Sequence, residues 1–261
     1  MLRSTFLHAV GADARLERNL WRQGALTWEE FLRGPYDVPD EAAIKSEIEG
    51  SIAALDEKDR TFFSRRLPSA YRWRAFDEFG EKTAYLDIET DGRTLITVIG
   101  VFDGFEMHQY VLGDNLNDFR RDIEQYDLIV TYFGENFDLP MIQRNFPSVF
   151  FDQVHIDLCP VLRRLGYKGG LKKVERLMGI YRDGDVDGLD GRAAIRLWQD
   201  HIDGKRGALD LLLKYNYDDC ANLAVLMKKA YKKLRADTGY DAIARRVKAD
   251  AAVSDSRSAA D

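Results

Sequence analysis

The sequence of 261 residues has little of several features that mark whole classes of protein. Its two cysteines, Cys159 and Cys220, are too few for a disulfide framework or a thiolate zinc site. No stretch approaches the roughly 20 consecutive apolar residues of a membrane-spanning helix. The chain begins with Met1–Phe6, which lack the long apolar run of a secretory signal. From these absences we expect a soluble, cytoplasmic protein that does not associate with membranes.

The composition supplies one sizeable folded domain and a small appendage. Hydrophobic residues make up 45% of the chain and aromatic residues 11%, enough to bury a core and to argue against disorder along the whole length. The net charge of −6 is unusual for a nucleic-acid-binding protein, since such domains are mostly basic. A protein that gathers carboxylates around metal ions lowers its own net charge while still binding a polyanion. The charge alone therefore does not decide the function.

Residues 1–80 carry apolar and charged side chains at helical spacing, and we expect a small N-terminal helical region there. Thr27 and Glu30 form a predicted capping box at the start of one short helix, and Gly24 ends the helix before it. The pair resembles a degenerate helix-hairpin-helix, a unit that often binds the nucleic-acid backbone; a plain helical cap on the main domain is the alternative. Residues 41–66 are predicted to continue as one amphipathic helix.

Around residue 83 the pattern changes to runs rich in β-branched residues. Strands are predicted over residues 83–89, 94–102, 105–112 and 127–133. Helices are predicted over residues 114–125 and 207–235, and the chain beyond Pro140 is expected to be mainly helical. This order indicates an α/β domain with a mixed central sheet flanked by helices over residues 81–235. The tail, residues 236–261, is predicted to be flexible.

Acidic residues in three separate segments carry the chemical signal. Asp87 and Glu89 lie two apart on a predicted strand, so both carboxylates point to one face. Such a pair is costly unless a cation lies between the two carboxylates, and a divalent metal ion is the usual answer. An edge strand that presents acids to solvent is the alternative.

The second and third segments are weaker signals by themselves. Asp138 follows a predicted strand, and Pro140 suits the first turn of a helix, so Asp138 is either a site residue or a helix-capping aspartate. Tyr215 and Asp219 lie four apart on one face of the last helix, where they could also form a simple hydrogen-bonded pair. Their occurrence in this order, at well-separated positions, is what makes the set informative.

Together the three segments resemble the motifs of a nuclease superfamily. Asp87-Ile88-Glu89-Thr90, Asn136-Phe137-Asp138 and Tyr215 to Asp219 are similar to the motifs of DEDD-superfamily 3′-5′ exonucleases with a tyrosine in the third motif. The proofreading domain of family B DNA polymerases is the familiar example. Stand-alone YprB-type RNase H-like domains look closer, because they are also similar at Asp157-Leu158, Gly170 to Glu175, Gly188 to Arg192 and Tyr215-Asn216. The resemblance covers residues 83–234 and implies an RNase H-like fold.

The resemblance also implies a mechanism and a ligand set. Two Mg²⁺ or Mn²⁺ ions would be held by Asp87, Glu89, Asp138 and Asp219. Tyr215 would orient the attacking water, since a tyrosine with a pKa of about 10 suits positioning better than proton abstraction. The expected reaction is 3′-5′ hydrolysis of phosphodiester bonds at the ends of single-stranded DNA, with RNA possible. Asp157 is expected to be structural, with a fifth acid near the site as the alternative.

Several further residues are candidates for substrate contact. Thr90 and Phe137 belong to the motifs, and Lys172 and Lys173 lie in a basic run between the second and third motifs that could guide phosphates. Such a run is more often only a solvated face. Phe133 occupies a position where relatives usually have Asn; it could stack on a base or, as the residue pattern favours, fill the core.

Two other functions remain open from the sequence. A non-catalytic nucleic-acid-binding module would be expected to have lost at least one of the motif residues, which are all present. An RNase H-like endonuclease would use the same metal chemistry, although the Tyr-x-x-x-Asp spacing favours the exonuclease. A monomer is expected because no coiled-coil heptads occur.

Overall fold

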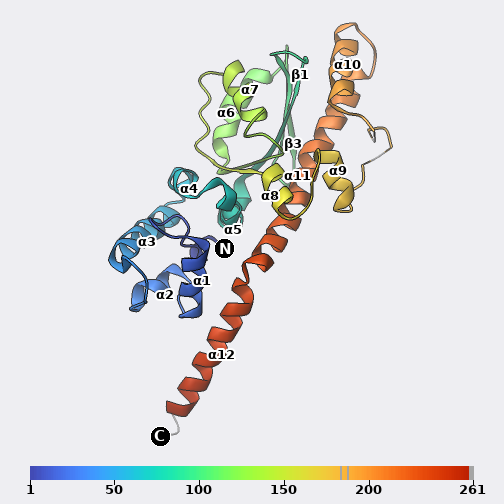
Figure 1. Cartoon of the computed structure of the whole chain (residues 1–261). Coiled ribbons are helices and arrows are strands. Elements are labelled where there is room, and N and C mark those ends of the chain that lie inside the picture. Colours follow the sequence, from blue (N-terminus) through green and yellow to red (C-terminus); the bar gives the residue numbers. More distant parts are fainter. Residues whose placement is uncertain (183, 187, 259–261) are drawn as a thin grey trace. The chain divides into compact units, whose positions relative to one another are not determined.

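The computed structural model describes residues 1–182, 184–186 and 188–258 (Figure 1). These residues form two compact units. The first unit combines residues 1–79 with the chain from Tyr231 onward, and the second is Gly80–Ala230. No helix within the described ranges is both long enough and apolar enough to cross a bilayer.

The second unit is built on the mixed sheet that the sequence predicts. Its strands are β1 (Thr83–Thr90), β2 (Ile96–Phe102), β3 (Met107–Val111), β4 (Leu128–Thr131) and β5 (Val154–Asp157). The spatial order is β3-β2-β1-β4-β5, in which β1 pairs antiparallel with β2 and parallel with β4. Strand β5 was not predicted, because it has only four residues and lies in a stretch interpreted as mainly helical.

Helices cover both faces of this sheet. The remaining elements of the unit are η3 (Gly80–Lys82), η4 (Leu116–Asp118), α6 (Phe119–Asp122), η5 (Ile123–Gln125), α7 (Asp138–Asn145), α8 (Leu158–Arg164), α9 (Leu171–Leu177), α10 (Gly191–Ile202) and the first part of α11 (Ala208–Thr238). The helix predicted over 114–125 is therefore three short pieces, η4, α6 and η5.

Alternation along β1 divides the core into two parts. Leu86 and Ile88 face the layer of α6 and α7, where they join a buried apolar cluster. On the opposite face, Val98 of β2 packs with Leu212 and Tyr215 of α11 and with the buried side of α10. Because Asp87 and Glu89 alternate with Leu86 and Ile88, their side chains emerge on the face covered by α11.

One glycine allows α11 to lie close against the sheet. Gly100 of β2 pairs with Asp87 of β1 across the antiparallel ladder. A β-carbon built on Gly100 would lie 2.1 Å from Asn216 Oδ1 and 2.8 Å from Cys220 Sγ, both on α11. Only a residue without a side chain fits there, so Gly100 sets the approach of the helix that carries Tyr215 and Asp219.

The first unit is helical, as predicted for its N-terminal part. Its elements are η1 (Leu2–Ser4), α1 (Ala14–Arg22), α2 (Trp28–Arg33), α3 (Glu41–Asp56), α4 (Arg60–Arg66), η2 (Ser69–Ala75), α5 (Phe76–Phe79) and, after α11, α12 (Tyr240–Ser258). The predicted capping box of Thr27 and Glu30 is present at the start of α2.

The single helix predicted over residues 41–66 is wrong. Lys58 adopts a left-handed backbone conformation with φ of 56°, which ends α3. The carboxylate of Asp59 then accepts a hydrogen bond from the backbone N–H of Phe62 and starts α4. The apolar stripe continues across this break, and so the spacing alone did not reveal it.

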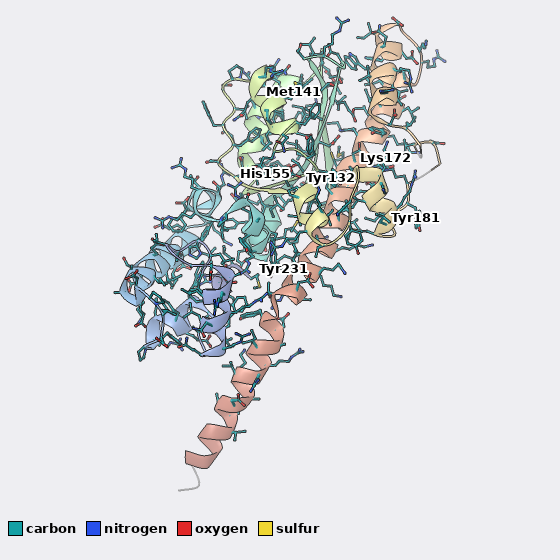
Figure 2. The ribbon with its side chains drawn as sticks, in the orientation of Figure 1. Tyr132, Met141, His155, Lys172, Tyr181 and Tyr231 are labelled. Atoms are coloured by element: carbon teal, nitrogen blue, oxygen red, sulfur yellow. The ribbon has the colours of Figure 1, made fainter. Side chains whose placement is uncertain are left out.

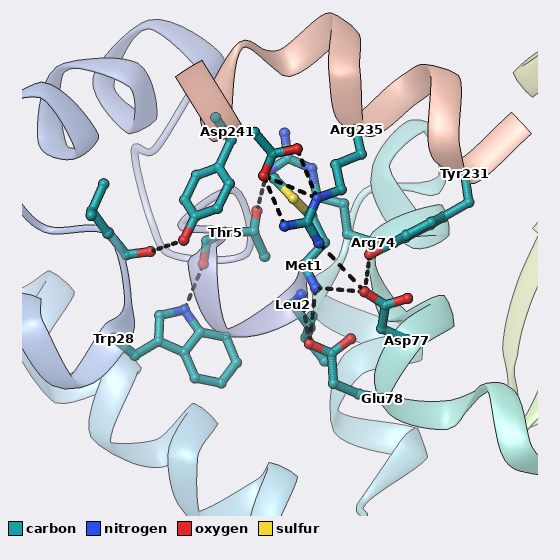
Figure 3. A network of polar contacts seen from close by, with 12 residues as sticks. Met1, Leu2, Thr5, Trp28, Arg74, Asp77, Glu78, Tyr231, Arg235 and Asp241 are labelled. Atoms are coloured by element: carbon teal, nitrogen blue, oxygen red, sulfur yellow. Dashed lines mark hydrogen bonds and ion pairs between the residues drawn. The ribbon is translucent and has the colours of Figure 1, made fainter. Parts of the chain in front are cut away.

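A buried ion pair organises the core of the first unit. Arg74 donates to Glu17 at 2.7 Å, and the side chains are 3% and 1% exposed. Thr5 Oγ1 donates to Glu17 at 2.8 Å and accepts from Arg74 at 2.9 Å, so the charges are hydrogen-bonded on several sides. Trp28 Nε1 donates to the Thr5 carbonyl at 2.6 Å, which ties α2 to the same network (Figure 3).

The start of the C-terminal segment contacts this unit, and residues 240–258 are helical; the flexibility expected for residues 236–261 stays a prediction. Arg235 donates to the carboxylate of Asp241 at 2.8 Å, and the hydroxyl of Tyr231 donates to Asp77, which also pairs with Arg235 (Figure 3). Tyr240 OH donates to the Leu26 carbonyl at 3.1 Å. These contacts, with good helix formers such as Ala, Arg and Lys, account for α12; residues 259–261 lie outside the described residues.

Replacing Gly100 tests whether its contact with α11 determines the packing of the second unit. We expect Gly100→Ala to lower the free energy of unfolding by about 1–3 kcal/mol, because the added methyl group overpacks against Asn216 and Cys220. Gly191→Ala is the matched control, since a β-carbon at Gly191 meets nothing within 4 Å. Urea unfolding followed by circular dichroism measures the free energy of unfolding of both variants. Equal stability of the two variants would contradict the role given to Gly100.

Candidate active site

Three carboxylates from two elements meet on the α11 face of the sheet. Asp87 and Glu89 come from β1, and Asp219 comes from α11. Each offers an oxygen such that these ligand atoms lie within 4.8 Å of one another. Glu89 and Asp219 are buried, whereas Asp87 is partly exposed. The structure thus brings together three of the four predicted metal ligands and excludes an edge strand that simply presents acids to solvent.

The fourth predicted ligand, Asp138, lies beside this cluster but outside the set of three. It is the first residue of α7, and Phe137 is the N-cap residue. Asp138 is 4% exposed, and its Oδ1 accepts a hydrogen bond from the backbone N–H of Ile88 at 3.2 Å. Because Ile88 lies between Asp87 and Glu89 in β1, Asp138 adds a fourth carboxylate to the same polar centre.

Burial and mutual repulsion act against ionisation of these acids. Burial, with Asp219 and Asp138 close by, raises the pKa of Asp87 and that of Glu89 well above their ordinary values. Burial likewise raises the pKa of Asp138, to about 7, and that of Asp219, for which the Arg182 guanidinium opposes the shift. Such a cluster has a strong electrostatic reason to bind cations.

The donor set fits a divalent metal ion. Carboxylate oxygens are the ligands that Mg²⁺ and Mn²⁺ prefer. Glu89 Oε1 is buried and has no hydrogen-bond partner among the described residues, so an acceptor is left that a cation would satisfy. The cluster could therefore hold a divalent ion, and its chemistry does not distinguish between Mg²⁺ and Mn²⁺.

A cavity of about 440 Å³ opens onto the acidic cluster. Besides the three acids it is lined by Tyr215, by Thr90 and Phe137, and by the start of α10 around Arg192. Thr90 lies at a β-bulge at the end of β1, and Phe137 is 42% exposed. Thr90, Phe137 and Tyr215 thus line the cavity, together with residues at the start of α10 to which the sequence analysis assigned no site role.

Tyr215 has two cationic neighbours. Lys172 Nζ lies 4.1 Å from the centre of its ring, and the Arg182 guanidinium lies 5.7 Å from it. Burial and the neighbouring carboxylates raise the pKa of the Tyr215 hydroxyl far above its ordinary value. Lys172 therefore contacts a residue of the site without lining the cavity itself. Lys173 is exposed and does not line the cavity either.

Arg182 is the main residue that the sequence analysis missed. Its guanidinium donates to both carboxylate oxygens of Glu175, at 2.6 and 2.8 Å, and also to Asp219. Asn222 donates to Glu175 at 3.1 Å, so a hydrogen-bonded chain links α9, the segment after it and α11. Glu175 and Arg182 are seven positions apart, and no regular spacing in the sequence signals the pair.

Asn216 of α11 contacts Asp87, one of the three acids of the cluster. Its Nδ2 lies 3.3 Å from the Asp87 carbonyl oxygen and 3.4 Å from Asp87 Oδ2, while its Oδ1 accepts from Gln109 at 3.2 Å. Asn216 is fully buried, so these bonds fix its amide firmly. It neighbours Tyr215 in the third motif, which was the available sequence signal.

Phe133 does not fill the core, which corrects the interpretation favoured from the sequence. The side chain is 49% exposed, and the backbone is left-handed with φ of 69°. Asp157 Oδ1 accepts from the backbone N–H of Phe133 at 2.8 Å, and Oδ2 accepts from that of Glu135 at 3.2 Å. These hydrogen bonds stabilise a backbone turn in which the Phe133 side chain is directed toward solvent. This agrees with the structural role expected for Asp157.

The raised pKa of Asp138 predicts a pH-dependent stability in the metal-free protein. In the unfolded chain the Asp138 carboxyl group loses its proton near pH 4, whereas in the folded protein it keeps the proton up to about pH 7. The contribution of the protonated Asp138 carboxyl group to the free energy of unfolding is therefore complete below pH 4 and is lost as the pH rises to about 7. We expect Asp138→Asn to be more stable than the wild type at pH 8, by on the order of a few kcal/mol, with a smaller difference near pH 4.

Urea unfolding at several pH values in the presence of a chelator measures this difference. Asparagine keeps an acceptor for the Ile88 N–H, so the substitution removes the ionisation with little change in shape. Addition of Mg²⁺ at pH 8 is the control, because it is expected to stabilise the wild type and narrow the gap. A difference that stays constant between pH 4 and pH 8 would contradict the assignment.

The chain was compared with protein families, curated proteins and solved structures. A model of the RNase H superfamily matches residues 84–231. The family B DNA polymerase from the hyperthermophilic archaeon Pyrobaculum calidifontis is a structural neighbour, with a TM-score of 0.47 and 15% identity over 56% of this chain. The matched part is 24% of the polymerase, so this chain spans about a quarter of its length. No curated protein matches the sequence.

The family match covers more than half of the chain and includes every predicted motif. It extends from β1 to α11 and so contains Asp87, Asp138 and Asp219. It confirms the RNase H-like fold and relationship predicted from the acidic motifs, and it supports a nuclease-type function, for which divalent metal ions are the usual cofactors. The chain belongs to the RNase H superfamily.

Proposed function

We propose that the protein is a metal-dependent 3′-5′ exonuclease that hydrolyses single-stranded nucleic acid, with DNA favoured and RNA possible. The observation that carries this proposal is the meeting of Asp87, Glu89 and Asp219 in one cavity that Tyr215 also lines. Asp138 lies against the same strand. A shared cavity gives a phosphodiester access to the carboxylates and to the tyrosine at once.

Asp87, Glu89, Asp138 and Asp219 would together hold two Mg²⁺ or Mn²⁺ ions. When bound, such ions supply Lewis-acid stabilisation of the attacking and leaving oxygens of an in-line displacement. The protein's own contribution is to keep the acids in fixed positions. Asn216 holds Asp87, the Ile88 N–H holds Asp138, and Arg182 holds Asp219.

Tyr215 acts as a positioning group that keeps its proton. Its hydroxyl has a strongly raised pKa because of burial and the nearby acids, so it donates a hydrogen bond and does not abstract a proton at neutral pH. Packing of Lys172 against one ring face restricts the orientation of the side chain. The hydroxyl would thereby orient the attacking water.

The strand would enter along the exposed aromatic and polar rim of the cavity. Phe137 offers a ring face on which a base can stack without sequence preference, and Thr90 offers a hydroxyl to the sugar-phosphate backbone. Lys172 and Lys173 provide positive charge on α9 for the phosphates. Free single-stranded 3′ ends are the proposed substrate, acted on by a monomer.

Digestion of end-labelled oligonucleotides tests the activity. We expect 5′-labelled single-stranded DNA to shorten stepwise from its 3′ end in Mg²⁺ or Mn²⁺ and to remain intact in a chelator. Asp219→Asn is expected to lower the rate by about 1,000-fold or more, since it removes a carboxylate from the metal cluster. Asp210→Asn, an exposed position on the same helix, is the matched control.

Two outcomes of this experiment would overturn the proposal. Binding of the strand without cleavage in either metal would favour a non-catalytic binding module. Cleavage of circular single-stranded DNA would favour an endonuclease, because a circle has no end from which an exonuclease can start. An RNA substrate of the same sequence, run in parallel, gives the sugar preference.

Removal of the Tyr215 hydroxyl tests its positioning role separately. We expect Tyr215→Phe to lower kcat by about 100-fold and to leave the affinity for the strand unchanged, because the ring beneath Lys172 is retained. Tyr217→Phe is the control, since Tyr217 is 44% exposed on the same helix and does not line the cavity. Equal activity of the two variants would exclude a role for the hydroxyl.

A further inference from the structure

A tight turn after β4 presents an aromatic ring to solvent at the edge of the sheet where the acids lie. Strand β4 pairs in parallel with β1. Because the carboxyl ends of parallel strands meet at the same edge of a sheet, the turn that begins at Phe133 lies at the same edge as Asp87 and Glu89. Phe137, which follows this turn, lines the acidic cavity. The turn is therefore a neighbour of the candidate active site.

This turn holds Phe133 in a backbone conformation that disfavours a large side chain. Its φ of 69° lies in the left-handed region, where bulky residues are rare. The carboxylate of Asp157, which is only 6% exposed, accepts three backbone N–H groups. They belong to Phe133, Glu135 and Cys159, at 2.8, 3.2 and 2.9 Å. The fold thus enforces an unfavourable conformation at a residue whose ring is 49% exposed.

The residues on both sides of Phe133 have little freedom. A β-carbon on Gly134 would lie 2.3 Å from Thr131 Oγ1, so glycine is required directly after Phe133. On the other side, the hydroxyl of Tyr132, which is labelled in Figure 2, donates to the Gly169 carbonyl at 2.5 Å. The backbone that carries the Phe133 ring is therefore held in place before any ligand arrives.

We infer that Phe133 binds an unpaired base of the nucleic-acid strand by stacking, and that Asp157 positions the ring for this contact. The inference rests on the proposed nuclease function and adds a second aromatic contact to that of Phe137. Strained backbone conformations gather at active sites and ligand contacts, where the strain serves to preorganise a group. A flat apolar ring that is held toward solvent beside the acidic cavity matches the flat face of a nucleobase.

The contact has a consequence for the choice of substrate. Within a duplex the neighbouring base pairs cover the faces of each base, so only an unpaired base can stack on Phe133. Every base has such a face, and stacking therefore tolerates any sequence. The ring is expected to favour a single strand over a duplex without selecting among the four bases.

Removal of single bases tests the contact. Single-stranded DNA oligonucleotides with one abasic site at each position in turn are bound to the full chain in Ca²⁺, with fluorescence anisotropy as the readout. We expect a position near the 3′ end at which loss of the base weakens binding of the wild type about tenfold but leaves binding of Phe133→Asn unchanged. Asparagine tolerates a left-handed backbone, so this variant removes the ring and keeps the turn. Phe133→Trp keeps an aromatic face and is expected to retain the position effect.

Phe150→Ala is the matched control. The Phe150 ring is 80% exposed in the same unit, its backbone is not left-handed, and it does not line the acidic cavity. This variant is expected to bind every oligonucleotide as the wild type does. Equal effects of Phe150→Ala and Phe133→Asn would mean that any exposed ring contributes, which would contradict the inference.

Asp157→Asn tests the positioning role. The amide leaves one acceptor oxygen for the three N–H groups, so the turn loosens while the Phe133 ring remains. We expect a smaller position effect at the same nucleotide, and no further loss when Phe133→Asn is added, because both substitutions act on one contact. An unchanged position effect in Asp157→Asn would exclude the positioning role.

Equal position dependence in the wild type and in Phe133→Asn would overturn the base contact, whatever the nuclease assay gives. A uniform weakening at all positions in Phe133→Asn would also overturn it, because the ring would then support the fold and not one base. Conversely, a position effect that needs the ring would establish the contact even if no metal supports hydrolysis. Failure of the base contact and failure of the proposed reaction are therefore separate results.

Discussion

The repulsion among buried carboxylates is the constraint on which the second unit depends. Asp87 and Glu89 share one strand face, and α11 adds Asp219 to them at close range. That approach is possible because Gly100 leaves room for Asn216 and Cys220 of α11. Without bound cations the arrangement opposes folding, as the raised pKa values of these acids indicate. Apolar contacts between the sheet and α11 on the same face offset this electrostatic cost.

The protein offsets part of this repulsion with its own cations. Arg182 pairs with Asp219 while Glu175 holds the guanidinium in place, and Lys172 lies over the ring of Tyr215. An arginine suits this position because its planar group serves two carboxylates at once and keeps its charge when buried. Glu89 still has a buried oxygen with no hydrogen-bond partner among the described residues, so the cluster could hold a further cation.

Local sequence patterns predicted most of the helices and strands and the acidic site residues. They gave no signal for contacts between residues that are distant in the sequence. The strand periodicity gave β1 and the shared face of Asp87 and Glu89, and the capping box gave the start of α2. The four-residue strand β5 and the break at Lys58 have no comparable signal. The ion pair of Arg182 exists only after a helix-ending turn reverses the chain. Likewise, α12 depends on contacts between Tyr240 and a loop more than 200 residues earlier.

The negative net charge and a polyanionic substrate are compatible once the charges are located. The acids that define the candidate active site are largely buried and directed at one cavity, where cations would neutralise them. Basic side chains of α9 and of the segment after it, Lys172 and Arg182 among them, line the adjoining pocket. In the proposed function, a phosphate at the acidic cavity would meet the bound cations as well as these basic side chains, although the sum over the chain is −6. Local potential, which decays over about 10 Å at moderate salt, decides binding at this distance, and the total charge does not.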